Sequence, residues 1–254
     1  MEMTMSRIHS HERVLTATAL VALTMLAWWH LIMQGSADGM SMSMPASSDW
    51  GLQMLGVSVL MWSVMMIAMM LPSAGPMILT YTRVYQKRRA NGSALVPTWL
   101  FVVGYLTIWV GFAIFAALAQ WSLHQSTLLS SAMGHVGPLL GGSLLIMAGA
   151  FQFSGLKQAC LGKCRTPLSF LTTEWREGRT GAFTMGLRHG AFCTGCCWAL
   201  MLLMFVGGVM SLVWMVALAV YLLTEKLLPR ADDISRLVGG LLVLAGIALP
   251  LVMA

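Results

Sequence analysis

The cysteines of this sequence fall into two small groups that could hold a soft metal ion. Cys160 and Cys164 stand one helical turn apart, and Cys193, Cys196 and Cys197 follow later in the chain. If both segments are helical, side chains three or four positions apart share a face. Thiolate sulfur selects Cu(I), zinc or iron–sulfur clusters. The spacing therefore predicts a metal site built from both groups, with Cu(I) as the expected ion and zinc as the alternative.

His189 extends the second group, because on a helix it shares a face with Cys193 and Cys197. Basic side chains close in sequence would favour thiolate over thiol, and they are Lys157, Lys163, Arg165 and Arg188. Two other readings of the cysteines stay open. Disulfides are typical of oxidising compartments, and a buried cysteine can be a small apolar side chain.

Methionine is the second over-used sulfur residue, with 23 copies. Met40, Met42 and Met44 occupy every second position, which places their sulfurs along one edge of an extended chain. Thioethers bind Cu(I) without having to lose a proton, so we expect this segment to contact the ion. The alternative is a flexible loop in which methionine is incidental.

A further row of methionines lies on a predicted helix. Met61, Met65 and Met69 fall on one face, with Met66 and Met70 on the adjacent stripe. Such a row could form a path for an ion that leads away from the first methionine group. Packing is the alternative, because unbranched methionine fills irregular helix interfaces well.

Long apolar segments must position these side chains. Hydrophobic residues make up 58% of the 254 residues and charged residues 9%, a balance that a water-soluble domain could not cover with polar surface. A helix needs about 20 apolar residues to cross a bilayer. We predict an all-α fold, a polytopic transmembrane helical bundle that is a single membrane domain over residues 1–254, with seven spans at about 14–33, 50–71, 98–120, 133–153, 190–208, 212–228 and 237–253.

The basic residues predict the orientation of this bundle. With seven spans, all 15 Lys and Arg residues lie on one side, which the positive-inside bias makes the cytoplasmic side. We therefore expect a multi-pass protein of the bacterial inner membrane, with its N-terminus in the cytoplasm and its C-terminus in the periplasm. The net charge of +6 then suits a lipid bilayer, and we expect no nucleic-acid partner.

Prolines and one long connection complete the expected plan. Pro72 and Pro76 are expected to end the second helix, and Pro97 to open the third. Residues 154–189 form the predicted cytoplasmic connection, with a short surface helix near Glu174. The cysteines from Cys193 onward would then begin the fifth helix and lie in the inner leaflet.

Glu225 is the one acidic residue expected inside the membrane, where ionisable groups carry a functional hypothesis by default. Pairing with the adjacent Lys226 or with Arg188 would explain it equally well. Small residues allow helices to approach closely in lipid, and the candidates are Gly186 with Gly190, Gly141 and Gly142 with Gly149, and Gly239 and Gly240 with Gly246.

The chain resembles an uncharacterised bacterial family of predicted metal-binding integral membrane proteins. The resemblance covers about residues 50–254 and is carried by residues 65–73 with their methionines, 156–167 with Cys160 and Cys164, 186–201 with the second cysteine group, and Glu225-Lys226. It implies a membrane protein with a metal site and no assigned activity. The segment with Met40, Met42 and Met44 lies outside this pattern.

The favoured hypothesis is a membrane protein that handles Cu(I) for transport, delivery or the metallation of a membrane enzyme. Its partner would be a metallochaperone or a metalloenzyme complex in the membrane. The sequence has no Gly-x-x-x-x-Gly-Lys-Ser/Thr motif for ATP-driven pumping, and we assign no catalytic residue. The alternatives are a thiol–disulfide electron relay and a structural or assembly subunit of a larger membrane complex.

Overall fold

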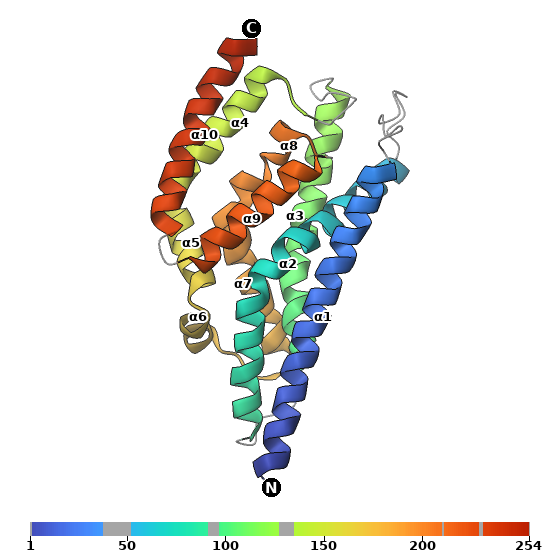
Figure 1. The fold of residues 1–254 in the computed structure, drawn as a ribbon, viewed down its shortest axis with the longest axis vertical. Helices are drawn as coiled ribbons and strands as arrows, with labels where there is room; N and C mark the ends of the chain where they lie inside the picture. Colours follow the sequence, from blue (N-terminus) through green and yellow to red (C-terminus); the bar gives the residue numbers. More distant parts are fainter. Residues whose placement is uncertain are drawn as a thin grey trace.

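The computed structural model describes residues 2–37, 52–90, 97–126, 135–209, 211–228 and 231–253. Over these residues the fold is helical and contains no strand, so the all-α prediction is confirmed. Met40, Met42 and Met44 lie outside the described residues. The helices shown in Figure 1 are α1 (Glu2–Ala37), α2 (Leu52–Ala90), α3 (Thr98–Gln125), α4 (Pro138–Gln152), α5 (Gly155–Arg165), α6 (Pro167–Glu174), α7 (Gly178–Met201), α8 (Met204–Gly207), α9 (Leu212–Leu227) and α10 (Ala231–Met253).

Several of these helices are suited to a membrane. Among the described residues, five segments are long and apolar enough to cross one, and they lie in α1, α2, α3, α7 with α8, and α10. α4 and α5 pass the same test together but bend by 65° at their junction, which gives a sixth candidate. α9 has 16 residues, fewer than the roughly 20 that cross a bilayer. The predicted count of seven spans therefore stays a prediction.

The helices form an elongated bundle whose two termini lie at opposite ends (Figure 1). α1, α2 and α3 run along its length on one side, and α4 packs against α10 on the other. α7 lies against α3 and α5, and α9 contacts α2, α5 and α10. In the interior of the bundle, α5 thus packs against α7 and α9, which in turn contact α3 and α2.

α2 continues to Ala90, so the prediction that Pro72 and Pro76 end the second helix is wrong. A proline inside a helix leaves the carbonyl four residues earlier without its backbone donor. For Pro72 that carbonyl belongs to Ala68, and the indole Nε1 of Trp28 in α1 donates to it at 3.0 Å. The helix bends near its middle and goes on (Figure 1).

Close packing of α4 on α10 depends on glycines. A Cβ atom added at Gly142 would lie 2.6 Å from the carbonyl oxygen of Gly246, and one at Gly149 would lie 2.7 Å from that of Gly239. Such distances are closer than carbon and oxygen can approach, so only glycine permits this spacing. The predicted role of these four glycines is confirmed, whereas Gly240 faces open space.

α7 begins at Gly178 rather than near residue 190. Residues 154–189 consequently form α5, α6 and the first half of α7, and not only a short surface helix. At 1.5 Å per residue, Cys193 lies about 22 Å from the start of α7. The prediction that the second cysteine group begins its helix is therefore wrong, because this group lies in the middle of α7. Pro97 does cap the N-terminus of α3, as predicted.

Candidate metal centre

The two cysteine groups meet where α5 packs against α7. Cys160 faces the backbone of Gly195, since a Cβ atom added there would lie 2.9 Å from the Cys160 Sγ. The thiol of Cys164 lies close to those of Cys193 and Cys196. Three of the thiols are almost fully enclosed: Cys193 is 1% exposed, and Cys196 and Cys197 are 0% exposed. Residues that are well separated in sequence thus come together at one place, called here the thiol cluster (Cys160, Cys164, Cys193, Cys196 and Cys197), in which Cys164 is partly exposed and the other four residues are buried.

Within α7 the thiols also bond to the helix itself. Cys196 and Cys197 both donate to the carbonyl oxygen of Cys193, each at 3.0 Å. Residues three and four positions apart on a helix share a face, so both sulfurs lie on the face of α7 that carries Cys193. A metal ion that binds these sulfurs must draw them away from that carbonyl.

Cys193 has two further partners from other helices. Lys226 of α9 donates from Nζ to the Cys193 Sγ at 2.9 Å and to the Ser73 Oγ at 2.9 Å. The hydroxyl of Tyr105 in α3 lies 3.2 Å from the same sulfur. Side chains of α3 and α9 therefore meet the Cys193 thiol of α7, and Ser73 of α2 holds the lysine that contacts it.

Tyr105 also connects the thiol cluster to the methionine row. Its hydroxyl donates to the carbonyl oxygen of Met70 at 3.1 Å. Met65, Met66, Met69 and Met70 are buried, each 1% exposed or less, and Met61 is partly buried. The backbone of α2 at Met70 is thus linked to Cys193 through the hydroxyl of Tyr105.

His189 lies one turn before Cys193 and is 2% exposed. Its ring stacks against Tyr105, with centroids 5.6 Å apart, and against Phe101 at 6.0 Å. Phe170 of α6 meets the ring edge-on at 5.5 Å. The Nδ1 atom is buried and has no hydrogen-bond partner in the structure. A buried imidazole nitrogen that makes no hydrogen bond is a suitable ligand atom for a soft metal ion.

Glu225 belongs to a second buried group. It forms an ion pair with Lys157 of α5, and both side chains are 0% exposed. The same carboxylate oxygen accepts hydrogen bonds from Tyr221, at 3.0 Å, and from Ser235. Lys157 also donates to Gln152. We call these residues the Lys157–Glu225 group.

The expected pairings of the charged residues are therefore corrected. Glu225 is paired with Lys157, and not with Lys226 or Arg188. Arg188 forms an ion pair with Glu174, and Arg165 bonds to Asp232 at 3.1 Å. The cation that touches the thiol cluster is Lys226, which was not among the four basic residues expected to favour thiolate.

The arrangement supplies the chemistry of a soft-metal site without a preformed coordination shell. Among the described residues, no set of three or more His, Cys, Asp and Glu side chains already has the spacing that holds a metal ion. Cys196 and Cys197 nevertheless lie on the face of α7 that carries Cys193, and α5 with Cys160 packs against the same helix.

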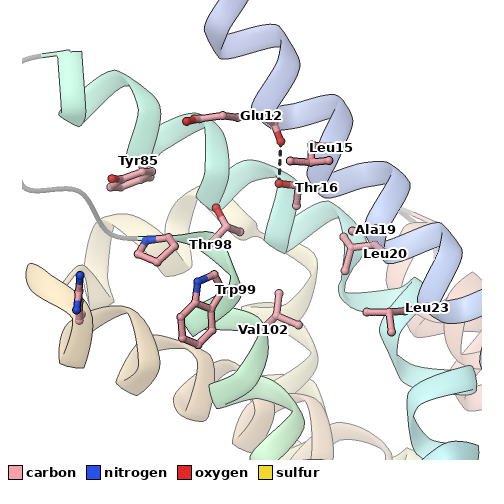
Figure 2. Close-up of a pocket in the computed structure, with 12 residues that line it drawn as sticks. Glu12, Leu15, Thr16, Ala19, Leu20, Leu23, Tyr85, Thr98, Trp99 and Val102 are labelled. Atoms are coloured by element: carbon pink, nitrogen blue, oxygen red, sulfur yellow. Dashed lines mark hydrogen bonds between the residues drawn. The ribbon is translucent and has the colours of Figure 1, made fainter.

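A groove on the outside of the bundle is unrelated to this cluster. It has a volume of about 590 Å³ and lies between α1, α2, α3 and the start of α7. Figure 2 shows Leu20 and Leu23 of α1 and Trp99 and Val102 of α3 along it. None of its lining residues carries sulfur, so it holds none of the predicted ligands.

Sequence reasoning missed Tyr105, Ser73 and Lys226 as neighbours of the thiols. Lys226 did carry a usable signal, because a lysine inside a membrane segment is costly and marks a functional site by default. Tyr105 and Ser73 carried none, since their positions depend on how α2 and α3 pack against α7.

Comparison with family models matches residues 59–249 to the PpoB2 family, described as a copper chaperone. Comparison with curated proteins and with solved structures gave no match. The matched range contains both cysteine groups, the methionines of α2 from Met61 onward, and the adjacent residues Glu225 and Lys226. It supports the metal-related family inferred from the cysteine motifs and gives it a copper-related role. The chain therefore belongs to the PpoB2 copper chaperone family.

Proposed function

We propose that this protein is an integral membrane copper chaperone that holds Cu(I) on the thiol cluster and releases it to a copper enzyme. The observation that carries the proposal is the meeting of Cys160 and Cys164 of α5 with Cys193, Cys196 and Cys197 of α7. Thiolates are the ligands that Cu(I) prefers, and the family match is to copper chaperones. His189, with its unpartnered Nδ1, is the proposed additional ligand.

The methionines provide the proposed path to this cluster. Met40, Met42 and Met44 would collect Cu(I), and Met61, Met65 and Met69 would pass it along α2. The hydrogen bonds of Tyr105 to the backbone carbonyl oxygen of Met70 and to Cys193 support a path that approaches the thiols at this point. Transfer between neighbouring soft ligands avoids the cost of placing a bare cation in an apolar interior.

We infer that the protein works in the bacterial inner membrane. The support is the set of apolar helices, the many large apolar side chains on the outer surface of the bundle and the distribution of Lys and Arg. The proposed topology has seven spans, with α4 and α5 sharing one and α9 forming another, and a cytoplasmic N-terminus. The lipid bilayer is then its environment, and a metallochaperone or a metalloenzyme complex in the membrane is its partner.

A competition titration tests the proposal. Purified protein in detergent micelles is titrated with Cu(I) against a chromophoric chelator, and the variant with Cys193, Cys196 and Cys197 all changed to Ser is compared with the unchanged protein. We expect the variant to lose high-affinity binding while keeping its helical content and monodisperse elution. Equal affinity in both proteins would exclude the thiol cluster as the copper site.

The methionine path is tested separately. Met65→Leu with Met69→Leu keeps volume and apolar character, so the fold should persist. The path predicts slower Cu(I) transfer from a donor chelator to the cysteines, with unchanged affinity at equilibrium. Met147→Leu is the matched control, because Met147 is 37% exposed on α4. Equal transfer rates in the unchanged protein, the double variant and the control would contradict the path and would indicate that Met65 and Met69 only fill space in the core.

The contact of Cys164 with Cys193 and Cys196 also keeps the electron relay as a second candidate. A relay would interconvert a thiol pair and a disulfide. Thiol labelling of metal-free protein with and without a mild oxidant distinguishes the two functions. A copper ligand set changes its labelling when Cu(I) is added, whereas a relay changes it with the oxidant alone.

A further inference from the structure

Lys226 has an unusual place beside the thiol cluster. Its side chain extends from α9 into the interior, the residue is 8% exposed, and its Nζ lies 2.9 Å from the Cys193 Sγ. Its second bond, also 2.9 Å, is to the hydroxyl of Ser73 on α2. Within the described part of the chain, no ion pair joins Lys226 to a carboxylate.

The neighbouring Glu225 does not neutralise this lysine. Adjacent residues on a helix do not face each other, and the Glu225 carboxylate is turned to Lys157, with which it forms a buried pair. That pair balances its own charge. Among the described residues the ammonium of Lys226 therefore has no carboxylate partner, and it places its positive charge directly at the Cys193 sulfur.

We propose that Lys226 is the specificity-determining residue of this site and that its fixed charge makes the site prefer a monovalent cation to a divalent one. The proposal rests on the proposed copper function and adds the residue that distinguishes Cu(I) from an ion such as Zn²⁺. Lys226 does so by electrostatic repulsion and need not bind the metal.

Distance makes this repulsion strong. A metal bound to a cysteine lies about 2.3 Å from the sulfur, so an ion on Cys193 comes within a few ångström of the ammonium. Interaction energy scales with the product of the charges and is weakly screened in a buried site. The ammonium therefore repels a divalent ion twice as strongly as a monovalent ion at the same place.

The charge balance of the site gives the same preference. When two thiols bind Cu(I) as thiolates, two S–H bonds break, two protons leave to solvent, and two metal–sulfur bonds form. The two thiolates then balance one Cu(I) and one ammonium. A divalent ion on the same two thiolates leaves one unit of positive charge buried without a partner, which is unfavourable. To reach neutrality it must recruit a third thiolate, and zinc sites normally need four ligands.

Three variants separate charge from structure. Lys226→Met removes the charge and keeps an unbranched side chain, whereas Lys226→Arg keeps the charge. Ser73→Ala removes the second hydrogen bond of the ammonium but leaves the ammonium in place. For each purified full-length protein, the affinities for Cu(I) and for Zn²⁺ are measured by competition with chelators of known affinity. Helical content and elution profile confirm the fold.

The expected result is a change in the ratio of the two affinities. In Lys226→Met the ratio of the Zn²⁺ affinity to the Cu(I) affinity should rise by about tenfold or more. The substitution removes a repulsion that is twice as strong for the divalent ion as for the monovalent ion. Lys226→Arg and Ser73→Ala should keep the ratio of the unchanged protein.

Two results would overturn the proposal. One is an unchanged ratio in a folded Lys226→Met protein, and the other is a shift in Ser73→Ala as large as that in Lys226→Met, which would indicate a structural role. If the unchanged protein binds no Cu(I) at all, it is the copper function that fails. If Lys226→Met does not fold, Lys226→Gln provides the uncharged comparison.

Discussion

Trp28 and Ala68 are joined by a hydrogen bond of 3.0 Å between the indole Nε1 and a backbone carbonyl oxygen. Pro72, four residues later, cannot donate to this carbonyl because proline has no backbone N–H. α1 therefore supplies the hydrogen bond that α2 lacks. This bond fixes α1 against the middle of α2, the segment that carries Met69, Met70 and Ser73.

Loss of this bond should weaken the fold. Trp28→Phe removes the indole donor and leaves a buried carbonyl unsatisfied, which costs about 1–3 kcal/mol. Thermal unfolding in detergent should show a lower midpoint for this variant. Trp29→Phe is the matched control, because Trp29 is 65% exposed. An equal decrease for the two variants would contradict the role given to Trp28.

Disruption of the Lys157–Glu225 pair should be more costly. Glu225→Gln leaves the ammonium of Lys157 buried without a counter-charge, and loss of one partner of a buried pair costs about 3–5 kcal/mol. Changing both residues to apolar ones should recover much of that loss. The exposed pair of Arg88 and Glu177 is the comparison, for which Glu177→Gln should cost less than about 1 kcal/mol. Similar midpoints for Glu225→Gln and Glu177→Gln would refute this prediction.

The glycine contact of α4 with α10 can be tested with two alanine substitutions. Gly142→Ala places a methyl group 2.6 Å from the Gly246 carbonyl oxygen, so the helices must separate, at a cost of about 1–3 kcal/mol. Gly240→Ala meets nothing within 4 Å and should stabilise α10 by about 0.5–1 kcal/mol. Midpoints of thermal unfolding should therefore move in opposite directions, and a common direction would show that the contact is not tight.

Gly195 provides a way to disturb Cys160 without altering a sulfur atom. A methyl group at this position would lie 2.9 Å from the Cys160 Sγ, so Gly195→Ala should turn that thiol away from α7. Changes next to metal ligands typically lower affinity by about 10–100-fold, and we expect a loss in this range for Cu(I). Gly162→Ala in α5 is the control, since a methyl group there meets nothing within 4 Å. Identical affinities would exclude Cys160 from the site.

The grouping of the cysteines could be predicted from sequence because it depends on local spacing and ligand type. The spacing of Cys193, Cys196 and Cys197 alone places them close together on a helix. The preference of thiolates for soft metal ions then predicts the kind of metal. Their location in the middle of α7 was not predictable from hydropathy, because Arg179 and Arg188 made the first half of the helix resemble a loop.

The error at Pro72 has a different cause. Proline normally ends or kinks a helix, and local sequence cannot show whether another helix will satisfy the freed carbonyl. Trp28 does so from 40 positions away. Only the packing of α1 on α2 reveals it.

The partner of Glu225 was partly within reach of sequence reasoning. Neighbours on a helix point in different directions, which argues against Lys226. The choice of Lys157 requires the position of α5, and that position depends on the 65° bend after α4.

The place of α5 in the chain sets an order of assembly during synthesis. Lys157 and Cys164 both belong to this short helix, yet their counterparts Glu225 and Cys193 lie in segments that the ribosome makes later. Until α9 has been inserted, the lysine has no counter-charge to accompany it into the lipid interior. The surroundings of the proposed copper site are thus among the last features to mature, and a chain truncated before α9 would lack both Glu225, the partner of Lys157, and Lys226, the partner of Cys193.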